Sequence, residues 1–225
     1  MLYDITILFM LPGLLLGLWA QMRVKSAYAK YSRVPTRAGL PANEAVRRLL
    51  RQNGAEQITV TETAGELTDH FDPRTDTLRL SQGVYHSTSV AALGIAAHEA
   101  GHALQKQQHY PFLSLRTALV PVVNIGSSLS WPIFLAGLIF SWEPLMTAGI
   151  ILFAAVVLFT LITLPVEIDA SRRAMAMLSG SGYLTAEEEK GAKSVLTAAA
   201  LTYVASFVSA MMQLLRLLAL SRRRD

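Results

Sequence analysis

Long apolar runs alternate with polar stretches along this chain. The apolar runs cover residues 5–20, 119–140, 145–166 and 195–220, and each has about the length needed to cross the hydrocarbon core of a bilayer, the first being slightly short. The polar stretches between them contain segments with helical or strand-like spacing. The pattern predicts a mainly α-helical membrane protein, in which transmembrane helices accompany a small α+β domain.

The first apolar run is predicted to be a retained transmembrane anchor, residues 1–22, rather than a cleaved signal peptide. Its first four residues contain no Lys or Arg, and residues 19–22 make a poor cleavage site. Basic residues follow it directly: Arg23, Lys25, Lys30, Arg33 and Arg37. Because basic residues that flank a span stay in the cytosol, we expect the N-terminus outside and the following residues inside.

The two central apolar runs are predicted to form a transmembrane helical hairpin, residues 117–166. Residues 141–144, with sequence Ser-Trp-Glu-Pro, form its expected turn. Pro121 and Pro132 predict kinks in its first helix. Two crossings return the chain to the side that it left, so the polar segments on both sides of the hairpin are expected to share the cytosolic face.

The segment 195–225 is predicted to be a C-terminal hydrophobic helix with a basic tail. Basic residues stand at both of its ends, so the sequence leaves open whether it spans the membrane or is partly re-entrant. Polar residues recur along it at helical spacing: Thr202, Ser206, Ser209, Gln213 and Arg216. Because lipid offers these groups no partner, we expect this stripe to face Asn124, Ser127 and Ser128 or a wet cavity, as packing surface or as a substrate path.

The polar segment 23–116 is predicted to contain a helix, a small β-element and a second helix. Helical spacing over residues 41–52 stops at Asn53-Gly54. Residues 58–60 and 78–80 alternate like short strands around turn-forming residues 72–76. The second helix is expected over about residues 90–108, capped by Ser87 or Ser89.

That second helix contains a His-Glu-x-x-His motif, formed by His98, Glu99 and His102. Residues four apart lie on the same face of a helix, so the two imidazoles can reach one Zn²⁺ ion. Glu99 lies one residue round the helix and can contact a water on that ion as a general base. Small residues at 96, 97, 100, 101 and 103 predict that another backbone packs closely against this helix.

A catalytic zinc site needs a third protein ligand and an open position for water. The candidates are His70, His86, His109 or a downstream carboxylate. Glu167 is favoured because residues 167–174 read Glu-x-x-Ala-x-x-x-Ala, whose small residues suit close packing on the metal helix. The competing interpretation is an ordinary carboxylate at a helix start. We assign residues 167–194 to the third-ligand helix and a connector.

Composition narrows the partners of the 225-residue chain. Hydrophobic residues make up 52% and charged residues 16%, which favours a membrane protein over a soluble domain. The chain has no Cys, so any zinc must be held by His and carboxylate side chains. The net charge of +4 is arranged around the apolar runs, which indicates lipid headgroups rather than nucleic acid as partners.

The chain resembles the YugP-like neutral zinc metallopeptidases of bacterial membranes and, more distantly, the HtpX-type membrane gluzincins. The motifs that carry the resemblance lie at residues 67–73, 80–81, 89–92, 96–103 and 164–171. It implies a gluzincin-like zinc metallopeptidase domain, with one Zn²⁺ per chain held by His98, His102 and Glu167 and with Glu99 as the catalytic base. It also implies a zinc-dependent metalloendopeptidase of the bacterial cytoplasmic membrane that acts on peptides or membrane proteins. The basic residues after the first apolar run predict that its site faces the cytosol.

One position departs from the broader gluzincin pattern. Those enzymes place an Asp four residues after the ligand Glu, where it orients a ligand histidine, and this chain has Ser171 there. The support of the histidines must therefore be built otherwise, and Asp169 is the candidate.

Several functional questions stay open at this stage. The main alternative is a membrane quality-control scaffold or adaptor with a structural or vestigial zinc site, and a zinc hydrolase for a non-peptide bond is a third reading. The strand around residues 78–81 either offers an edge to an extended peptide or only supports the metal helix. The donor to the oxyanion is one of His70, Arg172, Arg173 and Tyr183, and the oligomeric state is unknown.

Overall fold

The computed structural model describes residues 5–222, which divide into two compact units. The helical unit comprises Ser114–Pro165 with the described parts of Met1–Gln21 and Leu201–Asp225. The sheet-bearing unit comprises Met22–Leu113 and Val166–Ala200. Residues 1–4 of the predicted anchor and the end of the basic tail lie outside the described residues.

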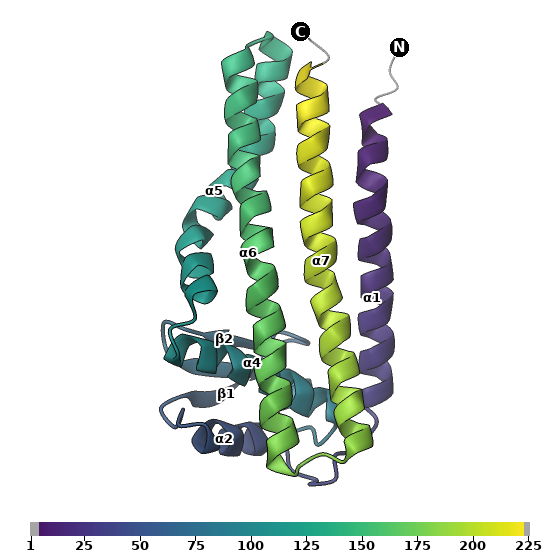
Figure 1. Ribbon diagram of the computed structural model, residues 1–225, viewed down its shortest axis with the longest axis vertical. Coiled ribbons are helices and arrows are strands. Elements are labelled where there is room, and N and C mark those ends of the chain that lie inside the picture. Colours follow the sequence, from purple (N-terminus) through teal and green to yellow (C-terminus); the bar gives the residue numbers. More distant parts are fainter. Residues whose placement is uncertain (1–4, 223–225) are drawn as a thin grey trace. The chain divides into compact units, whose positions relative to one another are not determined.

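The helical unit is formed by parts of long, apolar helices: η1 (Ile5–Met10) with α1 (Leu11–Tyr31), α5 (Pro111–Phe140), α6 (Glu143–Ser181) and α7 (Ala186–Arg222). Within residues 5–222, these four helical stretches are long and apolar enough to cross a membrane. The connection between α5 and α6 consists of Ser141 and Trp142, whereas Glu143 and Pro144, predicted to belong to the turn, begin α6. The helix α5, with two internal prolines, is bent in Figure 1. The sequence left α7 open, and its length and composition suffice for a full span.

The polar stripe of α7 lies largely against its neighbours in the helical unit, but not where the sequence placed it. A Cβ atom on Gly13 would lie 2.7 Å from the Cα of Ser209, and the Arg216 guanidinium lies 5.7 Å from the centre of the Trp131 ring. The expected partners Asn124, Ser127 and Ser128 are exposed instead, and both serine hydroxyls donate to the carbonyl of Asn124. Serine on a helix can satisfy its hydroxyl within its own turn, so it does not require a partner helix.

The sheet-bearing unit contains α2 (Ala42–Gln52), a three-stranded sheet, α3 (Gln82–Tyr85) and α4 (Val90–Gln107). One face of α2 is apolar and buried, and the helix ends at Asn53 with Gly54 in the left-handed region at φ +70°, as the sequence predicted. The strands are β1 (Thr59–Thr63), β2 (His70–Asp72) and β3 (Thr77–Ser81). Their order is β1-β3-β2, with β1 parallel and β2 antiparallel to β3.

The sheet order corrects the predicted role of residues 78–81. These residues belong to β3, which is the central strand and is paired on both sides, so it has no free edge for a peptide. The edge strand β2 was not predicted, because three residues reading His-Phe-Asp are too short to show a period-2 pattern. The turn at residues 72–76 reverses the chain and so allows β2 to pair with β3.

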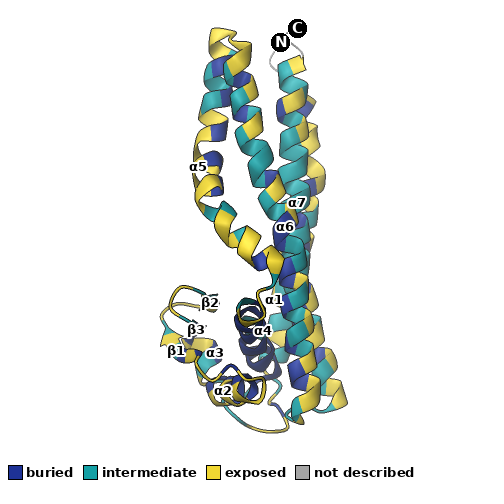
Figure 2. Cartoon of the chain, turned by 60° about the vertical axis from the view of Figure 1, so that its left-hand side comes forward, coloured by how far each residue is buried: buried dark blue, intermediate teal, exposed yellow. Residues whose placement is uncertain are grey.

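The helix α4 is the most deeply buried element of the sheet-bearing unit, and Figure 2 shows it almost wholly in dark blue. The Ser89 hydroxyl caps it by accepting from the Ala92 N–H at 3.2 Å. The helix α6 passes through Pro165 without a break, whereas the sequence ended one helix at Val166 and began another segment at Glu167. The change from apolar to polar residues at this point indicates that the helix passes from a lipid to an aqueous environment. It does not end the helix, because a helix forms its own backbone hydrogen bonds in both environments.

Candidate metal centre

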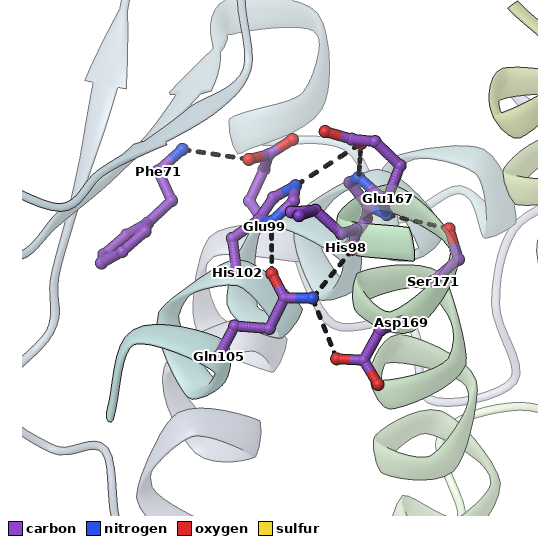
Figure 3. A network of polar contacts seen from close by, with 9 residues as sticks. Phe71, His98, Glu99, His102, Gln105, Glu167, Asp169 and Ser171 are labelled. Carbon is purple, nitrogen blue, oxygen red and sulfur yellow. Dashed lines mark hydrogen bonds and ion pairs between the residues drawn. The ribbon is translucent and has the colours of Figure 1, made fainter. Parts of the chain in front are cut away.

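Three side chains from two helices converge in the sheet-bearing unit. His98 and His102 lie one turn apart on α4, and their ring centres are 4.8 Å apart. Glu167 of α6 lies opposite them, with its Oε2 atom 3.2 Å from Nε2 of His98 and 3.6 Å from Nε2 of His102 (Figure 3). One potential ligand atom from each residue lies within 4.8 Å of the others. This is the cluster that the sequence predicted.

The donor set and its spacing fit a zinc ion. Zinc binds imidazole nitrogen and carboxylate oxygen at about 2.1 Å, and a tetrahedral arrangement at that length separates two ligand atoms by about 3.4 Å. The two nitrogen–oxygen distances of 3.2 and 3.6 Å bracket that value. Three protein ligands in a tetrahedral site would leave one position open, as catalytic zinc sites do.

The electrostatics of the cluster favour a cation. Only 3% of the Glu167 side chain is exposed, and 11% of the His102 side chain. Burial lowers the pKa of His102, but the hydrogen bond with Glu167 and the negative charges of Glu99 and Glu167 outweigh it, so the pKa is raised. A site that draws a proton onto a buried histidine also draws a metal ion, which replaces that proton.

Close packing of α4 on α6 brings Glu167 to the histidines. A Cβ atom on Gly101 would lie 2.4 Å from the carbonyl oxygen of Ala170, so a side chain at Gly101 would collide with the backbone of α6. Ala100 and Ala170 are fully buried beside it. The small residues of the metal helix therefore serve the close backbone approach that the sequence predicted.

Gln105 fixes the orientation of His102, a role that the sequence analysis missed. Its Nε2 donates to the Val166 carbonyl at 2.8 Å and to Oδ2 of Asp169 at 2.9 Å. Both partners are acceptors, so Oε1 of Gln105 must be the atom that lies 2.9 Å from Nδ1 of His102. His102 then carries its proton on Nδ1, and its Nε2 lone pair is left for a metal. The signal in the sequence was the spacing, because Gln105 lies three residues after His102 on the same face.

Ser171 supports the other histidine, at the position where the sequence departs from the gluzincin pattern. Its Oγ lies 3.1 Å from Nδ1 of His98. Asp169, the residue expected to take over that support, reaches His102 only through Gln105. The expectation for Asp169 is therefore corrected to an indirect role, because its carboxylate is held by Gln105 and by Arg173.

Glu99 lies beside the cluster and is held by the sheet. Its Oε2 accepts the backbone N–H of Phe71 at 3.0 Å (Figure 3). Phe71 is the middle residue of the edge strand β2, and this bond leaves from the side of the strand that does not face β3. The nearby Asp69 accepts from both the backbone N–H and the hydroxyl of Ser81, which ties the start of β2 to β3.

The other predicted candidates lie outside the cluster. Among residues 5–222, the three-residue group of His98, His102 and Glu167 is the one that could hold a metal. His70 is exposed with Nδ1 on the Thr68 carbonyl, and His86 faces Glu62 at 3.6 Å. Of the oxyanion candidates, Arg173 is bound to Asp169 and Gln108, so its guanidinium is already engaged. The choice of oxyanion donor stays a prediction.

Comparison with known proteins agrees with this site. Residues 6–222 match the family model described as "Putative neutral zinc metallopeptidase". The chain is also 45% identical over 201 residues to "Putative membrane protease YugP" of Bacillus subtilis (strain 168), a match that covers 89% of each protein. No solved structure matches the chain. The resemblance to the YugP-like zinc metallopeptidases is thereby confirmed, as is a mainly helical membrane protein with a small α+β domain.

Proposed function

Because this chain belongs to that family of neutral zinc metallopeptidases, we propose that it is an integral-membrane zinc metalloendopeptidase of the gluzincin type. The observation that carries the proposal is the convergence of His98, His102 and Glu167, with Glu99 beside them. We assign the first three as the ligands of one zinc ion and Glu99 as the general base.

The bound zinc would polarise the scissile carbonyl and lower the pKa of a water. Glu99 then takes a proton from the attacking water and passes it to the nitrogen of the leaving amine as the C–N bond breaks. The Phe71 N–H holds Oε2 of Glu99, which leaves Oε1 as the atom that moves the proton. Gln105 and Ser171 keep both imidazoles turned so that each Nε2 faces Glu167.

The outer edge of β2 lies beside Glu99, where the Phe71 N–H is held by that carboxylate, and we propose that the Phe71 carbonyl on the same edge accepts a backbone N–H of the substrate. An extended peptide on an exposed edge gains main-chain hydrogen bonds without a sequence requirement. In this proposal β2, rather than the neighbouring residues 78–81, offers the strand edge to the peptide. Peptides or exposed segments of membrane proteins are the proposed substrates.

We propose that the site faces the cytosol of a bacterial cell. The stretches Met22–Leu113 and Val166–Ala200 build one compact unit, so both must lie on the same side of a membrane that the helical unit crosses. The basic residues after the first span support the cytosolic side for that unit.

The decisive experiment compares the wild type with Glu99→Gln for cleavage of unfolded and membrane-protein substrates in detergent or liposomes. The variant should bind zinc as the wild type does and lose nearly all hydrolysis, because an amide cannot accept the proton. Hydrolysis at the wild-type rate would contradict the proposed mechanism. A zinc-loaded wild type without any hydrolytic activity would favour the scaffold or adaptor instead. A scaffold or adaptor does not require the Glu99 carboxylate beside the ligands, which is why we favour the peptidase.

A further inference from the structure

A groove of about 720 Å³ runs between α6 and α7 within the sheet-bearing unit. The two helices lie side by side in Figure 1, joined by the connector after Ser181. The residues that line the groove run from Ile168 to Ser179 on α6 and from Ala186 to Ala200 on α7. The proposed hydrolysis assigns this space no substrate, although its lining includes Ser171, the support of His98, and Arg172, one of the candidate oxyanion donors.

One end of the groove is apolar and adjoins the spans in sequence. Ile168 comes three residues after Pro165, where α6 leaves the helical unit, and Ala200 directly precedes Leu201, where α7 enters it. The lining at this end also includes Leu196. Ile168 is 47% exposed, so its side chain is available to an apolar ligand. This end of the groove therefore offers apolar surface that follows directly on the apolar runs along the chain.

Positive charge gathers further along the same groove. Arg172, Lys190 and Lys193 line it, against the single carboxylate of Glu189, which is hydrogen-bonded to Ser179 at 2.9 Å. Lys190 is paired with Glu187. Arg172 and Lys193 are both exposed, and within residues 5–222 neither forms a hydrogen bond or ion pair, although the charge of Arg172 helps to lower the pKa of Asp169. Three basic side chains against one carboxylate make the lining of the groove net positive here, which favours an anionic ligand.

The depth of these two cations suits a lipid headgroup. Arg172 is six residues beyond the apolar run 145–166, and Lys193 is two residues before the apolar run 195–220, which is about 3–9 Å along a helix. The headgroup layer extends about 5–8 Å beyond the hydrocarbon, and long basic side chains can reach back along a helix by several ångströms. Both groups can therefore meet a phosphate at the membrane surface.

We propose that this groove binds an anionic phospholipid, whose phosphate lies at Arg172 and Lys193 and whose acyl chain lies along Ile168, Leu196 and Ala200. The apolar end favours a phospholipid over a free anion, which has no apolar part to bury. The position of that end next to the apolar runs favours a phospholipid over a peptide. The inference concerns binding alone, so it stands whether or not the site at His98 hydrolyses peptides.

The test measures binding of fluorescent phosphatidylglycerol to the full-length protein in detergent micelles, with phosphatidylcholine as the neutral comparison. Wild type should prefer phosphatidylglycerol. Lys193→Gln should weaken its binding about fivefold, and Arg172→Gln/Lys193→Gln about twenty-five-fold, as expected for basic residues at a membrane surface. Both side chains are exposed, so unchanged helicity and zinc content would show that the variants are folded.

The matched control is Lys25→Gln. Lys25 is exposed and lies three residues after Met22, the start of the sheet-bearing unit, but it does not line the groove. It should retain wild-type binding. An equal loss in Lys25→Gln and Lys193→Gln would mean general attraction to a basic surface and would overturn the proposal, as would undiminished binding by Lys193→Gln.

A second variant tests the space rather than the charge. Thr197 is an exposed lining residue, and Thr197→Trp should fill the groove and abolish phosphatidylglycerol binding without changing any charge. Unchanged binding would overturn the proposal. So would equal competition by soluble glycerophosphate, which has no acyl chain, or by an acidic peptide, which would make the groove a peptide site.

Discussion

Gly101 of α4 and Ala170 of α6 approach so closely that a Cβ atom on Gly101 would lie 2.4 Å from the Ala170 carbonyl oxygen. The contact lies one residue before His102 and three residues after Glu167. The separation of the two helices at this point therefore decides whether a carboxylate on one helix can reach two histidines on the other.

Replacement of Gly101 by Ala should separate the helices. We expect Gly101→Ala to lower the free energy of unfolding by about 1–3 kcal/mol, because the overpacking strain exceeds the gain in helix propensity. It should also weaken zinc binding, which metal analysis after dialysis would measure. Gly94→Ala is the matched control on the same helix, since its Cβ atom would lie no closer than 3.6 Å to a neighbour. That variant should be as stable as the wild type or more so, and equal effects of both substitutions would contradict the packing argument.

Removal of the third ligand should remove the metal. Glu167→Ala leaves two histidines, which do not retain zinc against a chelator as three ligands do. The zinc content of the purified variant should fall from about one ion per chain to a small fraction of that. His70→Ala, which changes an exposed histidine outside the cluster, should keep the wild-type content. If His70→Ala loses zinc and Glu167→Ala keeps it, the ligand assignment is wrong.

Gln105 should influence metal affinity without touching the metal. Gln105→Leu removes the acceptor that holds Nδ1 of His102, and zinc affinity should fall about 10–100-fold, as expected when the support of a ligand histidine is lost. Competition with a zinc chelator would give the value. Gln107→Leu, an exposed position two residues later whose amide donates to Gly54, should leave the affinity unchanged. A similar affinity in both variants would show that His102 is oriented by other means.

Asp69 should make stability depend on pH. Burial raises the pKa of its carboxyl; the hydrogen bonds from Ser81 oppose this shift, and the charge of Glu99 adds to it. Ionisation of a group with a raised pKa disfavours the folded state, so its stabilising contribution is present below the unfolded pKa and is lost as pH rises through the folded value. Asp69→Asn keeps an acceptor for Ser81 and should be more stable than the wild type at neutral pH.

Thermal unfolding in detergent across pH 3–7 would measure this difference. It should shrink as pH falls towards about 4, where the wild-type carboxyl becomes neutral as well. Glu44→Gln, which removes an exposed carboxylate, controls for the change in net charge. A stability difference that does not vary with pH would contradict the assignment to Asp69.

The topology makes a separate prediction that needs no activity. The chain has no Cys, so single cysteines can be labelled without background. Ser32→Cys and Ser181→Cys both lie in the sheet-bearing unit and should be labelled from the cytosolic side of the membrane. Ser141→Cys, in the turn between α5 and α6, should be labelled from the opposite side. Labelling of Ser32→Cys and Ser181→Cys from different sides would refute the shared domain.

The sequence by itself determined the features that depend on short-range periodicity and on residue chemistry. The helix over residues 90–107 and the long apolar helices follow from spacing and composition, because both are local properties of the chain. His98 and His102 were paired by their four-residue separation for the same reason. The motifs at residues 96–103 and 164–171 also carried the family resemblance, which the comparisons confirm.

Only the tertiary structure decided which distant residues share the site. Ser171 reaches His98, and Val166 and Asp169 hold Gln105 against His102, because α4 and α6 pack at Gly101. No spacing along the chain contains these contacts between the two helices. The edge strand β2 depends on pairing with β3 rather than on its own three residues, and its N–H group at Phe71 holds Glu99. Chain-distant contacts arise from packing of complementary surfaces, which a local pattern cannot specify; in this protein, packing completes the support around the predicted zinc ligands.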